Sequence, residues 1–182
     1  MSLNIWFDKG LTKEAYMERL DKHKDAFHHI YNTFSVPEED KNKLKETKSL
    51  RAVVLAAEWC GHCMMDIPIF LHIAKVANID TRFLIRDDHL ELMDQYLTNG
   101  KRYIPMFIFI DEAGKEVGTW GPWAPEVNEF TEKLKADLPD RESAQFEEAF
   151  QQFIQKVSST FRSDEEMWNY VYEDMKKVLL SL

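Results

Sequence analysis

Apolar residues recur along this chain with two different periods, and each period predicts one kind of secondary structure. Nearly continuous apolar runs predict buried strands at 51–57, 81–86, 104–110 and 116–120. Between and around these runs, apolar residues return every three or four positions, which predicts amphipathic helices. The resulting order, strand-helix-strand-helix-strand-strand-helix, is typical of an α/β protein.

The connections between the predicted strands indicate how these strands pair. Strands separated by a helix favour parallel neighbours, whereas the tight turn at 111–115 favours an antiparallel hairpin. We therefore expect a mixed four-stranded sheet with helices on both faces. The helix after the first strand, residues 64–77, contains Pro68, which we expect to kink it. A further helix is expected at 87–98.

Helical patterns also lie at both ends of the chain, outside the predicted sheet. Residues 11–34 carry one long apolar stripe, with His23 as a packed, hydrogen-bonded residue on its inward face. Residues 35–47 predict a highly charged, solvated helix. Two stripes at 146–157 and 168–182 predict a helical hairpin that packs on the first helix or on a partner chain. The chain thus divides into an N-terminal helical extension (1–50), a core (51–138) and a C-terminal helical hairpin (139–182).

Composition and charge limit the classes of function. With 182 residues, 45% of them hydrophobic, the chain is long and apolar enough for one domain with a substantial core. Its net charge of -9 argues against nucleic acid or an anionic membrane as the partner. No apolar run approaches the roughly 20 residues that span a bilayer. The first residues lack the basic and apolar regions of a secretory signal, so we expect a cytoplasmic protein.

The only two cysteines, Cys60 and Cys63, lie where the first predicted strand passes into the next helix. The start of a helix offers unpaired N–H groups and the positive end of the helix dipole, and both stabilise a thiolate. Because the thiolate is the reactive form, this position favours dithiol redox chemistry over an inert pair. A zinc site would need two further ligands, and neither His62 nor the distant His72 completes one, so we expect no metal.

Three features occur together: the motif Trp59-Cys60-Gly61-His62-Cys63, Pro68 five residues after it, and a strand that opens with Ile104-Pro105 and leads to a hairpin. With this combination, residues 51–138 resemble the thioredoxin family. The resemblance implies a thioredoxin-like α/β fold, a mixed four-stranded sheet flanked by helices, here with extra N-terminal and C-terminal helices. The order of parts is similar to that of bacterial thioredoxin-like proteins of unassigned role.

The resemblance also implies roles for individual residues. Cys60 would be the nucleophile that attacks a substrate disulfide, and Cys63 would be the resolving thiol. This dithiol pair is then the redox group, with no separate cofactor. Pro105 would follow a cis peptide bond and expose the Ile104 backbone, so that a substrate segment can pair with it. The remaining residues of the expected docking surface are Trp59, Gly61 and Gly121.

One departure from thioredoxin lies between the two cysteines. His62 stands there, as in protein disulfide isomerases, where thioredoxins usually have proline. A histidine at this position can stabilise the Cys60 thiolate by charge or by a hydrogen bond. We therefore count His62 among the catalytic residues and expect a reduction potential less negative than that of thioredoxin.

A second departure concerns the base for the resolving thiol. The family often holds a buried carboxylate and a lysine partner on neighbouring strands, and these positions are Val54 and Phe83 here. Two apolar residues form a consistent replacement because neither leaves a buried charge unpaired. We expect Cys63 to have a raised pKa and to react slowly. Its candidate bases are His62, Glu58, Asp66 or water.

Together these features favour a thiol–disulfide oxidoreductase that reduces protein disulfides. Its partners would be disulfide-containing proteins or small thiol substrates, together with an upstream reductase or thiol donor. A homo-oligomer formed through the terminal helices is a further option. Two alternatives stay open: a redox-inactive or weakly active binding module that uses the same groove, and an exported disulfide oxidase or isomerase.

Overall fold

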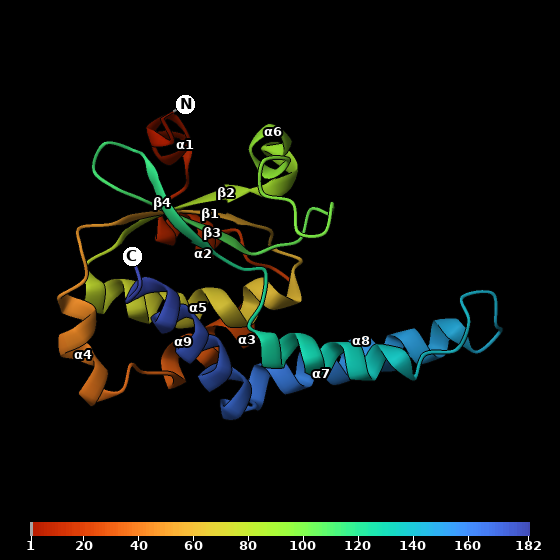
Figure 1. Cartoon of the computed structure of the whole chain (residues 1–182). Helices are drawn as coiled ribbons and strands as arrows, with labels where there is room; N and C mark the ends of the chain where they lie inside the picture. The colour runs from red at the N-terminus through yellow and green to blue at the C-terminus, as the bar shows by residue number, and fades with distance from the viewer. Residues whose placement is uncertain (1) are drawn as a thin grey trace.

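A computed structural model describes residues 2–182 and places one sheet at the centre of the molecule (Figure 1). Its strands are β1 (Arg51–Ala56), β2 (Asp80–Ile85), β3 (Met106–Ile110) and β4 (Glu116–Trp120), in the order β2-β1-β3-β4. Strands β1 and β2 are parallel, whereas β1 with β3 and β3 with β4 are antiparallel. The α/β class and the mixed four-stranded sheet expected from the sequence are confirmed.

The two central strands are almost completely apolar because helices cover both faces of the sheet. Every residue of β3 is buried, and in β1 only Arg51 reaches the surface. The edge strand β4 is mostly exposed, and only Trp120 at its end is buried. The sequence therefore placed the strands well, with differences of one or two residues at their ends.

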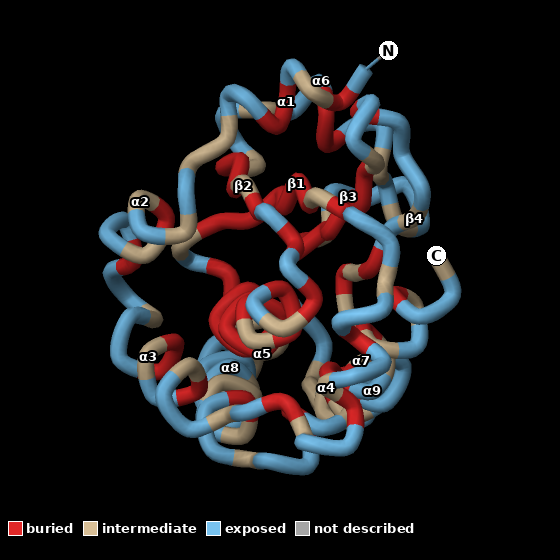
Figure 2. Tube along the Cα trace, turned by 90° about the vertical axis from the view of Figure 1, so that its left-hand side faces the viewer, coloured by how far each residue is buried: buried red, intermediate tan, exposed pale blue. Residues whose placement is uncertain are grey.

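Helix α5 (Gly61–Ala77) packs against one face of the sheet and is buried along most of its length (Figure 2). An outer layer packs on α5, consisting of α3 (Lys24–Thr33), α4 (Glu38–Lys45) and α9 (Glu165–Leu179). The opposite face carries α1 (Asn4–Lys9) and the short α6 (Leu90–Met93) (Figure 1). Helix α5 is thus the centre of the fold, and its first turn carries the two cysteines.

The prediction of one continuous helix over residues 11–34 is wrong. The chain forms α2 (Lys13–Glu18) and α3, with a turn between them. Tyr16 of α2 stacks on Phe83 of β2 with ring centroids 4.6 Å apart, whereas α3 packs against α5. One straight helix cannot pack against both β2 and α5. The requirements of tertiary packing therefore outweigh the helical period of the sequence.

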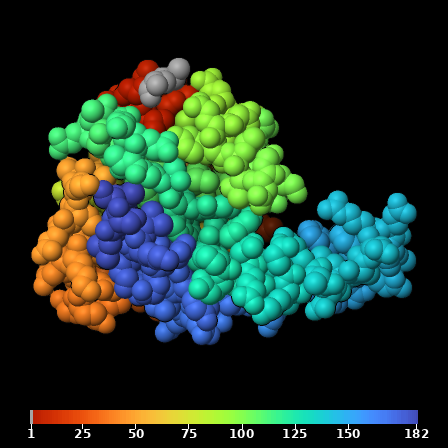
Figure 3. All heavy atoms as spheres, viewed as in Figure 1, coloured from red at the N-terminus to blue at the C-terminus, as the bar shows by residue number. Residues whose placement is uncertain are grey.

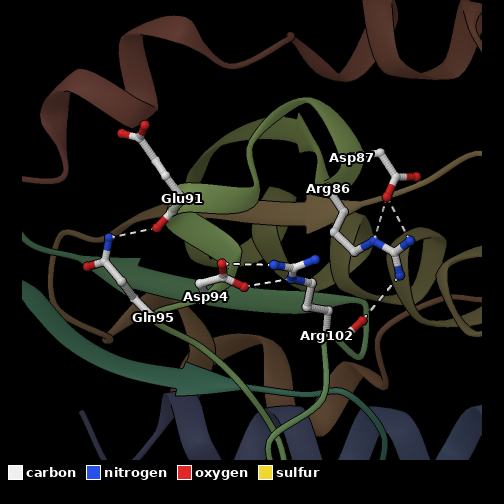
Figure 4. A network of polar contacts seen from close by, with 6 residues as sticks. All are labelled: Arg86, Asp87, Glu91, Asp94, Gln95 and Arg102. Atoms are coloured by element: carbon white, nitrogen blue, oxygen red, sulfur yellow. Dashed lines mark hydrogen bonds and ion pairs between the residues drawn. The ribbon is translucent and has the colours of Figure 1, made fainter.

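The helix expected at 87–98 is also shorter than predicted. A 3₁₀ turn (Arg86–Asp88) leads into α6, which ends at Met93. Beyond this end, both carboxylate oxygens of Asp94 accept hydrogen bonds from Arg102, and the Gln95 side chain donates to the Glu91 carbonyl (Figure 4). These side-chain contacts hold the segment in a turn.

Helix α4 is less solvated than expected because it packs on α5 and forms hydrogen bonds with α9. Leu44 is buried, and Asp40 is buried as well. The Asp40 carboxylate accepts hydrogen bonds from the Tyr172 hydroxyl at 2.8 Å and from the Lys176 ammonium at 2.6 Å. A charged residue of the N-terminal extension thereby fixes α9 to the core.

The predicted C-terminal hairpin consists of α8 (Phe146–Ser163) and α9. Helix α9 packs on α5, on β4 and on α7 (Pro125–Ala136). The far end of α7 and the first half of α8 instead project from the core as an arm (Figures 1 and 3). Buried apolar residues from all three predicted segments belong to one hydrophobic core. The division of the chain after residues 50 and 138 stays a prediction. None of the helices within residues 2–182 has the length and apolar character needed to cross a bilayer.

Candidate active site

The two cysteines form the start of α5. Cys60 is the N-cap residue, and its sulfur accepts a hydrogen bond from the Cys63 backbone N–H at 3.3 Å. Both are free thiols, and the Cys60 Sγ lies 3.5 Å from the Ile104 carbonyl oxygen, to which it donates. The helix start therefore brings the nucleophile expected from the sequence against the backbone segment expected to bind substrate.

The surroundings of Cys60 favour its thiolate. Burial alone opposes ionisation, but hydrogen bonds from the Cys63 thiol and from the backbone N–H groups of Cys63 and His62 outweigh it. The positive charge of Arg86 acts in the same direction, and together these groups lower the pKa of Cys60. Cys60 is only 7% exposed, so little of its sulfur is open to solvent.

Cys63 has the opposite character. Burial raises the pKa of this thiol well above its ordinary value, and the neighbouring Cys60 and Asp66 raise it further. This direction agrees with the raised pKa that the sequence analysis expects for Cys63. Val54 and Phe83, the two apolar replacements, are both fully buried and face each other in the register of β1 and β2. No charge lies at those two positions to help Cys63 lose its proton.

Asp66 is a buried carboxyl group that lies close to Cys63 on α5. It is 0% exposed, and neither of its oxygens has a hydrogen-bond partner within residues 2–182. It follows Cys63 by three residues on α5, which places the two side chains on the same face of the helix. Burial raises the pKa of Asp66 well above its usual range, and the charge of Cys60 adds to this effect. A buried carboxyl group without hydrogen-bond partners is unusual in a protein interior, which makes Asp66 a candidate for a functional role.

The surroundings of His62 do not favour the charge-stabilising role expected for it. Burial lowers the pKa of its imidazole to about 4, and the charge of Lys135 acts in the same direction. The ring packs between Trp123 and Phe161, with centroid distances of 5.5 Å and 4.9 Å. A neutral ring cannot stabilise a thiolate by charge, so Arg86 takes that part at neutral pH. The catalytic role of His62 stays a prediction.

Arg86 is a site residue that the sequence did not reveal. Its guanidinium lies over the Trp59 ring, 4.7 Å from the centroid, and donates hydrogen bonds to Asp87 and to the Arg102 carbonyl (Figure 4). Trp59 is itself 51% exposed beside Cys60. An arginine at a strand end gives no local signal, because its contact with Trp59 is made across 27 positions of the sequence.

The segment before β3 forms the expected backbone platform. The Ile104–Pro105 peptide bond is cis, as the resemblance implies. Gly121 has a φ of +126°, and a Cβ atom there would collide with the Pro105 carbonyl oxygen. Gly121 is thus required by a close approach of two backbone segments, while its role in substrate binding remains a prediction.

A groove of about 950 Å³ opens beside the cysteines. One side is formed by Trp59, Cys60, Gly61 and His62 of the motif, together with Ile104. His23 also lines it, and its Nε2 lies 3.2 Å from the Trp59 carbonyl oxygen, which gives it the predicted hydrogen-bond partner. The other side is the face of α8 from Glu147 to Arg162, which the sequence did not connect with the motif. Within residues 2–182, no cluster of three or more histidine, cysteine or acidic residues is arranged to hold a metal.

Comparison with known proteins relates both the core and the terminal helices to other folds. A family model described as thioredoxin matches residues 10–135. A comparison with curated proteins found no match. A protein of unknown function from Pseudomonas aeruginosa is 15% identical, with 100% of this chain and 98% of that chain covered and a TM-score of 0.70. An HIV epitope scaffold is 14% identical, with 100% and 99% covered and a TM-score of 0.67. A Fasciola hepatica thioredoxin is 28% identical over 46% of this chain and 79% of its own, with a TM-score of 0.33.

Proposed function

The chain belongs to the thioredoxin family, and on this basis we propose that it is a thiol–disulfide oxidoreductase that reduces disulfides with Cys60 and Cys63. The observation that carries this proposal is the position of Cys60 as the N-cap of α5, where its sulfur accepts the Cys63 backbone N–H and lies against the Ile104 carbonyl oxygen. Hydrogen bonds and Arg86 outweigh burial to lower the pKa of Cys60, whereas burial raises the pKa of Cys63. A reactive thiolate beside a protected thiol is the arrangement that two-step disulfide exchange requires.

In the first step, the Cys60 thiolate attacks one sulfur of a substrate disulfide. A bond forms between Cys60 and that sulfur, the substrate S–S bond breaks, and the second substrate sulfur leaves as a thiolate that takes a proton from water. Trp59 and the Ile104 backbone are the proposed docking groups, because they border the groove next to Cys60.

In the second step, Cys63 must lose its proton before it can attack Cys60. We assign Asp66 as the acceptor among the candidate bases, because its unpartnered carboxyl group shares a helix face with Cys63. The Cys63 thiolate then attacks Cys60, the mixed disulfide breaks, and the substrate leaves with two electrons gained. The protein is left with a Cys60–Cys63 disulfide, which an upstream thiol donor or reductase must reduce. A reducing compartment such as the cytoplasm suits this direction.

Reduction of a small uncharged disulfide, such as hydroxyethyl disulfide, tests the chemistry without demanding substrate recognition. The wild-type dithiol should reduce it, Cys60→Ser should be inactive, and Cys63→Ser should stop at a stable mixed disulfide that mass spectrometry detects. Far-ultraviolet circular dichroism checks that the variants fold. A folded wild-type protein that reduces no disulfide and forms no mixed disulfide would instead favour the binding-module alternative.

A further inference from the structure

Helix α8 adds a second wall to the groove, and this wall has a composition of its own. Its groove face includes Phe150, Ile154, Val157 and Phe161, which follow one another every three or four residues. Phe161 is fully buried beside His62, while Phe150 and Ile154 further along the arm are 38% and 44% exposed. The apolar face of α8 therefore continues outward from the cysteines instead of ending in the core.

Large exposed apolar side chains gather in this groove. Trp59 on the motif side and Phe150 and Ile154 on the α8 side all line it. A cluster of exposed apolar residues in a concave surface is typical of a binding site for another molecule. The three side chains come from two separate elements that meet only in the folded protein, so they form a surface and not a single amphipathic stripe.

The charge of the groove is opposite to that of the whole chain. The protein has 23 basic and 32 acidic residues, whereas the groove is lined by one acidic side chain, Glu147, and by five basic ones. The basic side chains are Lys22, Arg86, Arg102, Lys135 and Arg162.

Three of these cations already have carboxylate partners: Arg86 pairs with Asp87, Arg102 with Asp94 and Lys135 with Glu132 (Figure 4 for the first two). Lys22 and Arg162 have none within residues 2–182. These two positive charges are therefore free to receive an acidic ligand.

We propose, resting on the dithiol function above, that the groove selects disulfides in protein segments that carry apolar and acidic side chains beside the cystine. The apolar side chain would sit against Trp59, Phe150 and Ile154, and the carboxylates would face Lys22 and Arg162. The exchange chemistry is unchanged. What α8 adds is a preference for one class of substrate, carried by a wall outside the catalytic motif.

Three synthetic peptides test this proposal. Each has one cysteine in a mixed disulfide with thionitrobenzoate, whose release is followed by absorbance, and each has leucine nearby with aspartate, lysine or serine flanks. The reduced wild-type protein should react with the aspartate peptide about tenfold faster than with the lysine peptide, and 1 M salt should reduce this ratio. Equal rates for the three peptides would overturn the proposal.

Substitutions in the groove test whether its residues cause the preference for the aspartate peptide. Lys22→Glu with Arg162→Glu should remove the advantage of the aspartate peptide, whereas Lys177→Glu, an exposed cation on α9 outside the groove, should leave it unchanged. Phe150→Ser with Ile154→Ser should slow all three leucine peptides, whereas Ile5→Ser, at another exposed apolar position, should not. A preference that survives the groove variants would contradict the proposal.

Hydroxyethyl disulfide separates this inference from the proposed function. All of these variants should reduce it at the wild-type rate, because none of them touches a thiol. If wild-type protein fails to reduce it, the proposed function fails; if it is reduced while the peptides react equally, only the substrate preference fails. Sedimentation supplies the last control, since a dimer that Phe150→Ser dissociates would identify a second copy as the occupant and overturn the proposal.

Discussion

The two walls of the groove differ in origin and in what they do. The motif wall rests on β1 and α5, where nearly every side chain is buried, and it holds the thiols in fixed positions. The α8 wall belongs partly to a projecting arm, and its outer apolar residues remain exposed. The proposals above assign reactivity to the rigid core and selection of the substrate to helix α8.

The largest predicted effect comes from removing the packing contact between the two walls of the groove, which Phe161 of α8 makes with His62. Phe161 is fully buried against His62 and Phe130, so Phe161→Ala should remove a packed ring and leave a cavity. We expect the free energy of unfolding to fall by about 3–5 kcal/mol in a denaturant titration. Phe153→Ala, on the half-buried part of the arm, is the matched control. An equal loss of unfolding free energy in both variants would mean that the contact of Phe161 with His62 has no special importance for stability.

Asp66→Asn tests whether Asp66 accepts the proton of Cys63. Without a proton acceptor, the second step should slow by about a hundredfold, so that the mixed disulfide on Cys60 accumulates in a quenched time course. The first step, measured as alkylation of Cys60, should not become slower. Slowing of the first step alone would contradict the assignment of Asp66 to Cys63.

Stability against pH gives a second readout for Asp66. Its pKa is raised by burial in the folded protein, so its favourable contribution is complete below its unfolded pKa of about 4 and is lost as pH rises through the folded pKa. Wild-type protein should therefore lose stability relative to Asp66→Asn as pH rises above about 4, the unfolded pKa. A stability difference that stays constant as pH rises from this value would show that Asp66 ionises normally.

Arg86→Gln should produce a smaller change, confined to the nucleophile. Loss of the guanidinium removes a positive charge near Cys60 and the cation over Trp59. The pKa of Cys60, measured from its rate of alkylation against pH, should rise, and the rate at pH 7 should fall by a few-fold. Arg86→Lys should recover most of the rate because it keeps the charge.

The smallest effect is expected for His62→Phe. The imidazole is neutral at pH 7, because burial lowers its pKa to about 4, and its main contacts are aromatic. The pH profile of Cys60 alkylation should therefore change little between pH 6 and pH 8. A clear rise in the pKa of Cys60 would restore the charge-stabilising role that the sequence suggests for His62.

The motif wall was predictable because its signals are local in the sequence. The apolar runs gave the strands, and Cys60, Cys63 and Pro105 gave the site because their spacing and neighbours are specific. The α8 wall was not predictable, since an amphipathic stripe does not say which surface it will meet. For the same reason Arg86 and the buried Asp40 were missed, as their partners lie far away in the sequence.

A redox titration tests the central claim most directly, because it needs no knowledge of the substrate. The protein is equilibrated in glutathione buffers of graded potential, and its free thiols are alkylated and counted by mass. We predict one two-electron transition between a dithiol and a Cys60–Cys63 disulfide. Because hydrogen bonds and Arg86, in place of His62, favour the Cys60 thiolate, its potential should be less negative than the roughly -270 mV of thioredoxin. A folded protein that keeps both thiols free in oxidised glutathione would contradict the account.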